Sequence, residues 1–345
     1  MRAAHRSALR LGPLSLLWRP RAALVCSVLA LLCLLLSVLL LGTGTLALSP
    51  GDVLASLLGS TQNPSIDRIV QRVRLPRVLT ALLVGAALGM AGSIFQSISR
   101  NALGSPDVIG FTTGAASGAI VQIILFNAGP LETALAAVLS GLFTAALVFA
   151  LSLKGHVTGG YRLVLVGIGV GASLSGLNTM LLVMGNLDQA MSAQIWLAGS
   201  LNTRTWLHVI PAALGLLAIV PIAIYQARRI DLLELGDDAA SQLGVNVERS
   251  RLVLVLAAVG LTSIATAAAG PIAFIALAAP QLARRLTLAP EVPLISAAIM
   301  GSTLLLGADL LSQHLASDIN LPIGLVTGLL GGCYLLWLLA HSTRI

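Results

Sequence analysis

Long stretches without a charged residue dominate this chain. Nine such runs cover residues 22–51, 78–99, 108–131, 133–153, 163–187, 205–227, 252–283, 292–308 and 319–343. A helix needs roughly 20 apolar residues to cross the hydrocarbon core of a bilayer. Eight of the runs therefore each predict one transmembrane helix, with the run 292–308 extended past Asp309.

The run 252–283 is too long for a single span. Arginine residues flank it on both sides, namely Arg249, Arg251, Arg284 and Arg285. Because clusters of basic residues stay in the cytoplasm, both ends of this run belong on the same side, and the run must cross twice. The reversal is expected at Gly270-Pro271, since proline cannot continue a helix and glycine tolerates a turn.

Ten spans with both termini in the cytoplasm follow from this pattern. Fifteen of the 20 basic residues then lie inside and five outside, in the direction of the positive-inside rule. We expect one all-α transmembrane permease domain over 1–345, with a cytoplasmic segment at 1–21, a ten-helix core at 22–340 and a cytoplasmic loop at 228–251. The first run is longer than the apolar region of a secretory signal, so we expect it to remain as an uncleaved span.

The composition excludes other classes of protein. Hydrophobic residues make up 57% of the chain and charged residues 10%, against roughly 25% charged residues in an average soluble domain. A soluble domain of this length could not bury so much apolar surface, and a disordered chain requires the opposite composition. The net charge of +7 is therefore interpreted as orienting loops in the membrane, not as a nucleic-acid surface.

The cytoplasmic loop predicts a short helix over 237–243. Asp237 and Asp238 suit a first helical turn, Ala239 favours helix, and Gly244 after Leu243 is a good helix terminator. A compact helix at the cytoplasmic face suits docking into the groove of a partner protein. A solvated connector is the alternative interpretation.

The outside segment at about 43–75 is followed directly by Pro76 and Arg77. Pro76 is expected to hold Leu75 in an extended conformation and to begin the next helix. Arg74 and Arg77 then stand on the side of the membrane where positive charge is disfavoured. They either reach toward lipid headgroups or bind an acidic partner protein.

Small residues predict close helix packing in two spans. Gly85, Gly89 and Gly92 lie on one face of the second span, at a spacing that lets another helix approach closely. The fifth span repeats this feature with Gly167, Gly169, Gly171 and Gly176. A turn-rich cytoplasmic connection follows the second span, where Asn101 and Asp107 can cap the neighbouring helices.

The sequence lacks the motif for binding and hydrolysing ATP through a P-loop, and it shows no nucleophile–base pair typical of an enzyme. A P-loop needs Gly-Lys followed by Ser or Thr, whereas the single lysine, Lys154, precedes Gly155. Asp309 is the one acid deep in a predicted span, and an ion-coupled carrier usually needs more such groups. The pattern indicates a passage whose energy comes from elsewhere. An ion-coupled transporter with Asp309 as carrier is the alternative from another class, and a membrane enzyme is the weakest alternative.

Several segments resemble one known family, the FecCD-type permeases. They are 74–77, 85–89, 100–110, 235–245, 270–275 and 321–324, and the likeness runs collinearly from about residue 43 to 340. These permeases are membrane subunits of type II ATP-binding-cassette importers for ferric siderophores, haem and vitamin B12. The resemblance implies ten helices per subunit. The segments 103–108, 184–200 and 247–252 are most similar to the second permease subunit of ferric-enterobactin transporters.

The resemblance also implies a cargo, partners and a location. The expected cargo is a ferric siderophore of the catecholate type, with vitamin B12 or haem as alternatives. The expected partners are a second related permease forming a heterodimer, two cytoplasmic ATPase subunits, and a periplasmic or lipid-anchored siderophore-binding protein. ATP and Mg would be bound by the ATPase subunits, so this chain is expected to hold no cofactor or metal and to be no enzyme. The expected location is the bacterial cytoplasmic membrane.

Three groups of residues match functional positions of the family. The coupling helix that contacts the ATPase is matched by Asp237, Asp238, Ala239, Leu243 and Gly244. Arginines that bind glutamates of the binding protein are matched by Arg74 and Arg77. A cytoplasmic gate is matched by Asn101 and Leu103, with Tyr161 where its other half would lie.

The chain departs from the family at two positions. Gln313 stands where the vitamin B12 member has a further docking arginine, which implies weaker docking on this half. Gln281, after Pro280, stands where many members have histidine. An obligatory protonation role at that position is therefore not expected.

Overall fold

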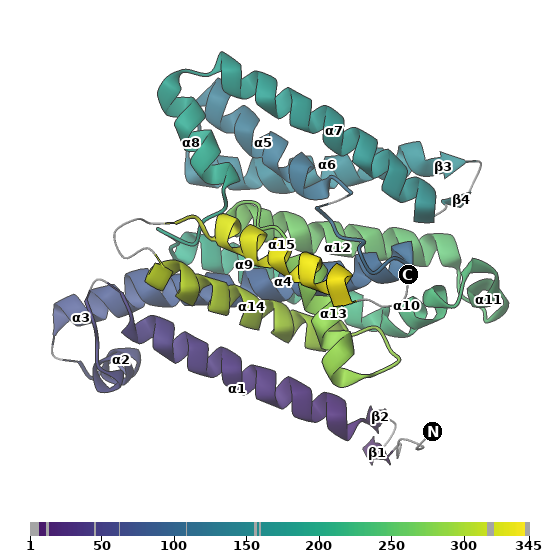
Figure 1. Cartoon of the computed structure of the whole chain (residues 1–345), viewed down its shortest axis with the longest axis horizontal. Helices are drawn as coiled ribbons and strands as arrows, with labels where there is room; N and C mark the ends of the chain where they lie inside the picture. The colour runs from purple at the N-terminus through teal and green to yellow at the C-terminus, as the bar shows by residue number, and fades with distance from the viewer. Residues whose placement is uncertain are drawn as a thin grey trace.

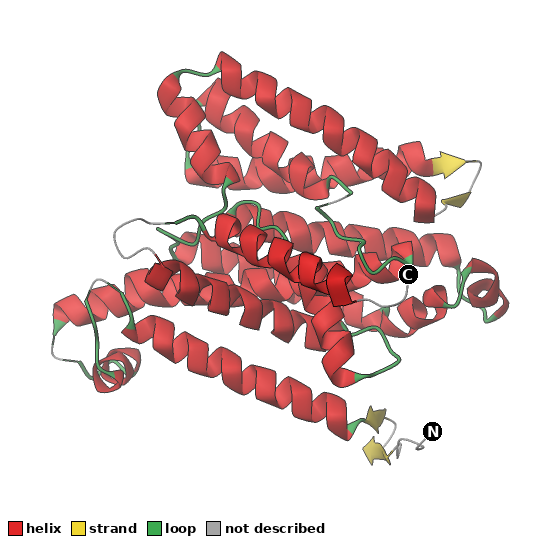
Figure 2. Ribbon diagram, viewed as in Figure 1, coloured by secondary structure: helices red, strands yellow, loops and turns green. Residues whose placement is uncertain are grey.

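The computed structural model describes residues 7–11, 14–44, 46–61, 63–107, 109–154, 157–158, 160–315 and 321–341. Helices make up nearly all of these residues, together with two short antiparallel ladders (Figure 2). The first part of the chain contains β1 (Ser7–Leu11), β2 (Leu14–Trp18), α1 (Pro20–Gly42), α2 (Pro50–Leu57), α3 (Pro64–Ile69), the π-helical segment η1 (Val70–Arg74), α4 (Leu75–Ser99), α5 (Phe111–Phe126), α6 (Pro130–Ser152), β3 (Leu153–Lys154) and β4 (Val157–Thr158).

The remainder of the chain is helical wherever it is regular. It contains α7 (Gly160–Met184), α8 (Leu187–Leu197), α9 (Trp206–Tyr225), α10 (Ala227–Glu234), α11 (Asp237–Gln242), α12 (Val247–Ala269), α13 (Ile275–Thr287), α14 (Leu294–Leu315) and α15 (Ile323–His341). β1 pairs with β2 before α1, and β3 pairs with β4 before α7. Helices occupy most of each predicted apolar run.

Seven described helices are long and apolar enough to cross a membrane, which makes the chain a multi-pass membrane protein. They are α1, the continuous helix Pro64–Ser99, α6, most of α7, α9, α12 and most of α14. α5 and α15 are apolar but shorter, and α13 has 13 residues. At about 1.5 Å per residue, α13 reaches only about 20 Å of a hydrocarbon core of about 30 Å. Length and composition thus identify seven spans where the charge pattern predicts ten.

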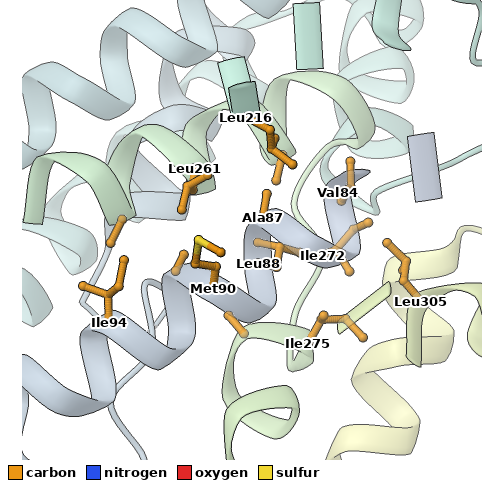
Figure 3. Packing of buried hydrophobic residues seen from close by; sticks show 14 of the residues in the cluster. Val84, Ala87, Leu88, Met90, Ile94, Leu216, Leu261, Ile272, Ile275 and Leu305 are labelled. Atoms are coloured by element: carbon orange, nitrogen blue, oxygen red, sulfur yellow. The ribbon is translucent and has the colours of Figure 1, made fainter. Parts of the chain in front are cut away.

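α4 lies at the centre of the bundle and packs against α9, α12, α13 and α14 (Figure 1). α5, α6, α7 and α8 form a group along one side of this centre, and α1 closes the opposite side. The most apolar 18-residue stretch of the helix Pro64–Ser99, which includes α4, is 78% buried, against 22% for that of α1. Neighbouring helices therefore shield α4 from lipid. The core around it includes Val84, Ala87, Leu88, Met90 and Ile94 of α4 with Leu216, Leu261, Ile272, Ile275 and Leu305 of other segments (Figure 3).

Two glycines of α4 let α14 approach its backbone. A Cβ atom on Gly85 would lie 2.5 Å from the carbonyl oxygen of Gly301, and one on Gly89 would lie 2.1 Å from that of Ala297. Gly92 meets α13 in the same way, because its Cβ would lie 1.7 Å from the Ala276 oxygen. Small residues allow such backbone contact within a bilayer. The packing face predicted for the second span is therefore confirmed.

The glycines of α7 follow that prediction only in part. A Cβ on Gly167 or Gly171 would collide with the backbone at Ile109 or Gly110, in the connection before α5. In the part of the chain that the structure describes, a Cβ on Gly169 or Gly176 would meet no neighbouring atom within 4 Å. The close-packing role assigned to all four glycines is thus wrong for Gly169 and Gly176 within the chain.

α4 is the last part of a longer continuous helix. That helix begins at Pro64, earlier than predicted. Leu75 has φ −61° and ψ −47°, which is helical, so the extended conformation expected before Pro76 is wrong. The wide turn of η1 explains this result, because the Leu75 amide donates to the Val70 carbonyl five residues back. A turn of this kind relieves the crowding of a proline ring against the preceding turn, and the helix continues through Pro76.

The chain leaves helical geometry at Gly270, as predicted. α12 ends there with φ +76°, a conformation that favours glycine, and residues 271–274 are irregular before α13 begins. Arg251 near the start of α12 binds Asp237, and Arg284 near the end of α13 binds Glu234. Both ends of the long apolar run therefore lie at one end of the bundle, beside α10 and α11.

Candidate functional site

Two opposite ends of the bundle carry the residues singled out in the sequence. We call the end with α10 and α11 the α11 end, and the end with α2 and α3 the α3 end (Figure 1). α11 covers Asp237–Gln242 with Leu243 as its C-cap, which confirms the predicted short helix. Gly236 and Gly244 bracket it with φ +116° and +84°, so glycine is favoured at both positions.

One side of α11 faces the core and the other is free. Ala240 is fully buried, and Ala239 is half-buried beside it. Asp238 and Gly244 are exposed, and the Leu243 side chain is 59% exposed. The predicted coupling residues therefore form a small surface of polar and apolar groups outside the helix core.

The inner side of α10 and α11 binds the core through two carboxylates. Glu234 accepts a hydrogen bond of 2.7 Å from the hydroxyl of Ser97, and it forms an ion pair with Arg284. Asp237 pairs with Arg251 at 2.8 Å and with Arg100 at 3.4 Å. These contacts fix the short segment to α4, α12 and α13.

A third acid, Asp231, binds the chain just before α14. Its Oδ1 atom accepts a hydrogen bond of 2.8 Å from the backbone amide of Val292. Burial raises the pKa of Asp231, and this hydrogen bond offsets part of the rise. Sequence reasoning missed α10 and these contacts, although Asp231 and Glu234 are three residues apart, a spacing that places two acids on one helical face.

At the α3 end, the Arg74 side chain turns inward. It is 8% exposed, and its Nη1 donates to the Leu41 carbonyl at 2.7 Å near the end of α1. Its Nη2 donates to the carbonyl of Leu46. Gly44 lies against the guanidinium at φ +139°, where a Cβ atom would come within 2.9 Å of Nη2. Arg74 thus joins the start of α4 to the chain that leaves α1.

Arg77 forms an ion pair with Asp309, the acid buried in α14. Arg77 Nε lies 3.0 Å from Oδ2 and Nη2 lies 2.7 Å from Oδ1, a bidentate geometry. The Asp309 side chain is fully buried and that of Arg77 is 22% exposed. A buried carboxylate requires a partner of opposite charge, so Asp309 alone was a signal for this pair. Gln313 Nε2 adds a hydrogen bond of 3.3 Å to Oδ2.

Arg68 and Arg72 are the exposed arginines of the same segment. Neither has an ion-pair or side-chain hydrogen-bond partner in the part of the chain that the structure describes. Gln71, which lies between them, holds this segment in place. Its side-chain Nε2 donates to the Ser56 carbonyl at 2.9 Å, and its backbone carbonyl accepts from the Trp206 indole at 3.0 Å. The two exposed guanidinium groups therefore project from a segment whose position is fixed by hydrogen bonds.

The fifth arginine of this side, Arg204, is engaged within the chain. Its Nε donates to the Ser200 carbonyl at 2.9 Å, and its Nη1 lies 3.1 Å from His208 Nε2. Burial lowers the pKa of Arg204 to about 10, so the group stays charged at neutral pH.

The connection 100–110 carries two of the predicted gate residues. Asn101 Oδ1 accepts from the Leu103 amide at 2.9 Å, which makes a local turn and leaves Leu103 49% exposed. Gln281 of α13 holds this turn by donating to the Ala102 carbonyl at 2.7 Å. Tyr161, at the start of α7, is 78% exposed.

The caps of the helices on either side differ from the expectation. Arg100, with φ +50°, is the C-cap of α4, and Gly110 is the N-cap of α5. Asp107 instead accepts a hydrogen bond of 2.6 Å from the hydroxyl of Thr112. Asn101 and Asp107 therefore shape the connection without capping either helix.

This arrangement defines a polytopic membrane protein with charged side chains at both ends of its helix bundle. Residues 29–341 match the model of the FecCD transport family, and the chain belongs to that family. It is 46% identical over 324 residues to the ferric enterobactin transport system permease protein FepG of Escherichia coli. This match covers 94% of this chain and 98% of that protein.

Other relatives carry different names. The chain is 38% identical to the achromobactin transport system permease protein CbrC of Dickeya dadantii, over 86% of this chain and 85% of that protein. It is 35% identical to the hemin transport system permease protein HmuU of Yersinia pestis, over 87% and 90%. Among solved structures, an inward-facing metal-chelate type ABC transporter matches with a TM-score of 0.82 and 30% identity, covering 92% of this chain and 99% of that one.

Proposed function

We propose that this chain is a permease subunit of an ATP-driven importer that moves a ferric siderophore of the catecholate type across the bacterial cytoplasmic membrane. The observation that carries the proposal is the 46% identity to a ferric enterobactin permease along nearly the whole of both chains. The lower identity of 35% to a hemin permease supports a siderophore over haem. In the functional unit, ten helices of this chain pair with a second, related permease.

The partner at the α11 end is a cytoplasmic ATPase, which binds ATP and Mg. The proposal rests on α11 as a short helix outside the core, with Asp238, Leu243 and Gly244 exposed for contact. Ala239 and Asp237 join this surface to the inner side of the helix. An exposed turn bracketed by two glycines suits insertion into a groove of a partner protein.

The partner at the α3 end is an acidic face of a siderophore-binding protein. Arg68 and Arg72 supply exposed guanidinium groups, and Arg77 keeps an Nη1 group outside its pair with Asp309. Arg74 supports the same segment from beneath. Guanidinium groups suit carboxylates because they offer several donors in one plane.

The gate proposal concerns the α11 end of the passage. Asn101 and Leu103 lie on a connection that Gln281 holds in place, and Tyr161 is exposed at the start of α7. In the outward-facing importer these side chains narrow the passage together with those of the second permease.

Ion-coupled transport through Asp309 receives little support. The carboxylate is fully buried and bound to two nitrogen atoms of Arg77. A carrier group must exchange its ion with solvent on either side, whereas this one has a fixed partner.

Uptake by intact cells tests the proposal. A bacterial strain that lacks its own ferric-catecholate permeases should receive the genes for this chain, a second permease, an ATPase and a binding protein. We expect it to accumulate radiolabelled iron from a ferric catecholate. A strain with the same proteins and an ATPase unable to hydrolyse ATP is the control. Equal accumulation in the two strains would contradict the proposal.

A further inference from the structure

Three acids on α10 and α11 bind three different parts of the helix core. Asp231 accepts from the Val292 amide before α14, and Glu234 binds α4 and α13. Asp237 binds α12 and the end of α4. The segment proposed to contact the ATPase is thus connected to the core through side chains whose partners are far apart in the sequence.

Glu234 lies between two helices. Its Oε1 atom accepts from the Ser97 hydroxyl of α4 at 2.7 Å and pairs with Arg284 of α13. Arg284 Nη2 is also 3.2 Å from the Ser97 oxygen, so the three groups form a closed triangle. A displacement of Glu234 therefore acts on α4 and α13 together.

Asp237 makes the second link, between α12 and the connection 100–110. It accepts from Arg251, whose side chain is 2% exposed, and from Arg100, whose side chain is 44% exposed. Arg100 is the C-cap of α4, with φ +50°, and it directly precedes Asn101. Asp237 thus reaches the first residue of the connection that carries the proposed gate.

The buried charge of Arg251 constrains the link through Asp237. Arg251 is buried and needs a carboxylate nearby, because a charge removed from water without a partner is costly. Glu248, one turn earlier than Arg251 in α12, shares that guanidinium at 3.2 Å. Asp237 can therefore move relative to α12 only by changing how the buried charge is balanced.

We propose that Asp237 and Glu234 are positioning residues that transmit movement of the ATPase to α4, α12 and α13, and through Arg100 to the connection 100–110. This inference rests on the proposed function. In it, the exposed side of α11 receives the movement and the two carboxylates pass it to the core. The residues do not touch ATP or cargo, so their loss separates hydrolysis from transport.

The test uses the complete importer reconstituted in liposomes. Asp237→Asn and Glu234→Gln remove one charge each with little change of shape. Glu291→Gln is the matched control, since Glu291 also pairs with an arginine at this end, Arg19, and makes no ion pair with α10 or α11 among the described residues. Its charge repels Asp231 of α10, so this variant weakens no attraction between the core and that helix. The readout is the amount of ferric catecholate taken up per ATP hydrolysed, measured beside the thermal stability of each complex.

We expect Asp237→Asn and Glu234→Gln to lower uptake per ATP about fivefold or more while hydrolysis continues, as for loss of a coupling interaction. The control should keep the ratio of wild type. The charge exchange Glu234→Arg with Arg284→Glu restores an ion pair and should recover part of the lost uptake per ATP. A purely structural role would instead lower the thermal stability of the complex and leave the uptake per ATP of the folded complex unchanged. If Asp237→Asn disrupts folding, Arg100→Gln tests the same link from its more exposed partner.

The outcomes separate the inference from the function on which it rests. If wild type shows ATP-driven uptake and the two acid variants keep its uptake per ATP, the inference is overturned and the proposed function stands. If Asp237→Asn lowers the ratio and Arg100→Gln lowers it as well, the route through Arg100 is supported. If wild type shows no ATP-driven uptake, the proposed function fails and the inference fails with it.

Discussion

Arg77 of α4 holds Asp309 of α14 through two nitrogen donors, although the residues are 232 positions apart. The pair lies along the same two helices that Gly85 and Gly89 bring into backbone contact with Gly301 and Ala297. Close packing and charge pairing therefore join these two helices together. Asp309 is consequently a structural partner of Arg77 in this chain.

Removing either member of that pair should destabilise the protein unequally. Arg77→Leu leaves Asp309 buried without its counter-charge, so we expect a loss near the lower end of about 3–5 kcal/mol. Asp309→Asn should cost less, because Arg77 is 22% exposed and can reach water. The double change to leucine should cost less than Arg77→Leu alone. Thermal unfolding of the purified complex in detergent measures the stability of all three variants. An equal loss of stability in Arg77→Leu and in the double variant would contradict the account.

Reversing the exposed charges at the α3 end should weaken docking of the binding protein. Arg68→Glu with Arg72→Glu replaces attraction by repulsion and touches no described internal contact, so affinity should fall about tenfold or more. Affinity for the complex in nanodiscs measures this change at low and high salt. Wild-type affinity should also decline as salt screens the charges over about 8–10 Å.

Arg249→Glu is the control for docking, because Arg249 is also exposed but lies at the α11 end, at the start of α12. It reverses one charge, against two in the docking variant, and should leave binding-protein affinity unaltered. Equal affinity for wild type and the Arg68 and Arg72 reversal at low salt would assign these arginines to lipid headgroups instead.

Crowding the exposed turn after α11 should uncouple the ATPase. Gly244→Trp places a large side chain where a Cβ meets no atom within 4 Å among the described residues beyond its chain neighbours, so it should obstruct a partner and not the fold. Because Gly244 has φ +84°, any side chain there adds backbone strain, and Gly244→Ala carries that strain with little bulk. We expect uptake to fall much further with tryptophan than with alanine. Similar uptake in both variants would argue against a protein contact at Gly244.

Shortening the gate side chain should loosen closure of the passage. Leu103→Ala removes apolar bulk from a turn that Asn101 and Gln281 continue to hold, so the connection should keep its shape. We expect a faster ATP-independent leak of a small solute from liposomes, with Leu103→Met as the control of similar volume. A leak as slow as that of wild type would leave Leu103 with a role in the turn alone.

The sequence predicts the positions of the helices well because the bilayer demands them. Charge-free runs correspond to α1, α4, α6, α9 and α12, and the break at Gly270 is where its flanking arginines require a reversal. The short helix α11 is also predicted, since its acidic first turn and terminal glycine are local signals. Each of these features depends on neighbouring residues alone.

Features that depend on distant partners are not predicted. Leu75 is helical because η1 widens the turn before Pro76, and no local rule indicates that the helix continues from α3. The inward orientation of Arg74 depends on carbonyls at the end of α1, and that of Arg77 on Asp309. The sequence identifies the arginine-rich segment but not which of its side chains face outward. The docking roles of Arg74 and Arg77 remain predictions.

Transport by the purified importer tests the central claim most directly. This chain should be reconstituted in liposomes with a second permease and the ATPase, and the binding protein and labelled cargo added on the α3 side. We predict ATP-dependent accumulation of a ferric catecholate that unlabelled ferric catecholate suppresses and that haem or vitamin B12 does not. Accumulation that needs no ATP, or that haem or vitamin B12 suppresses equally well, would contradict the account.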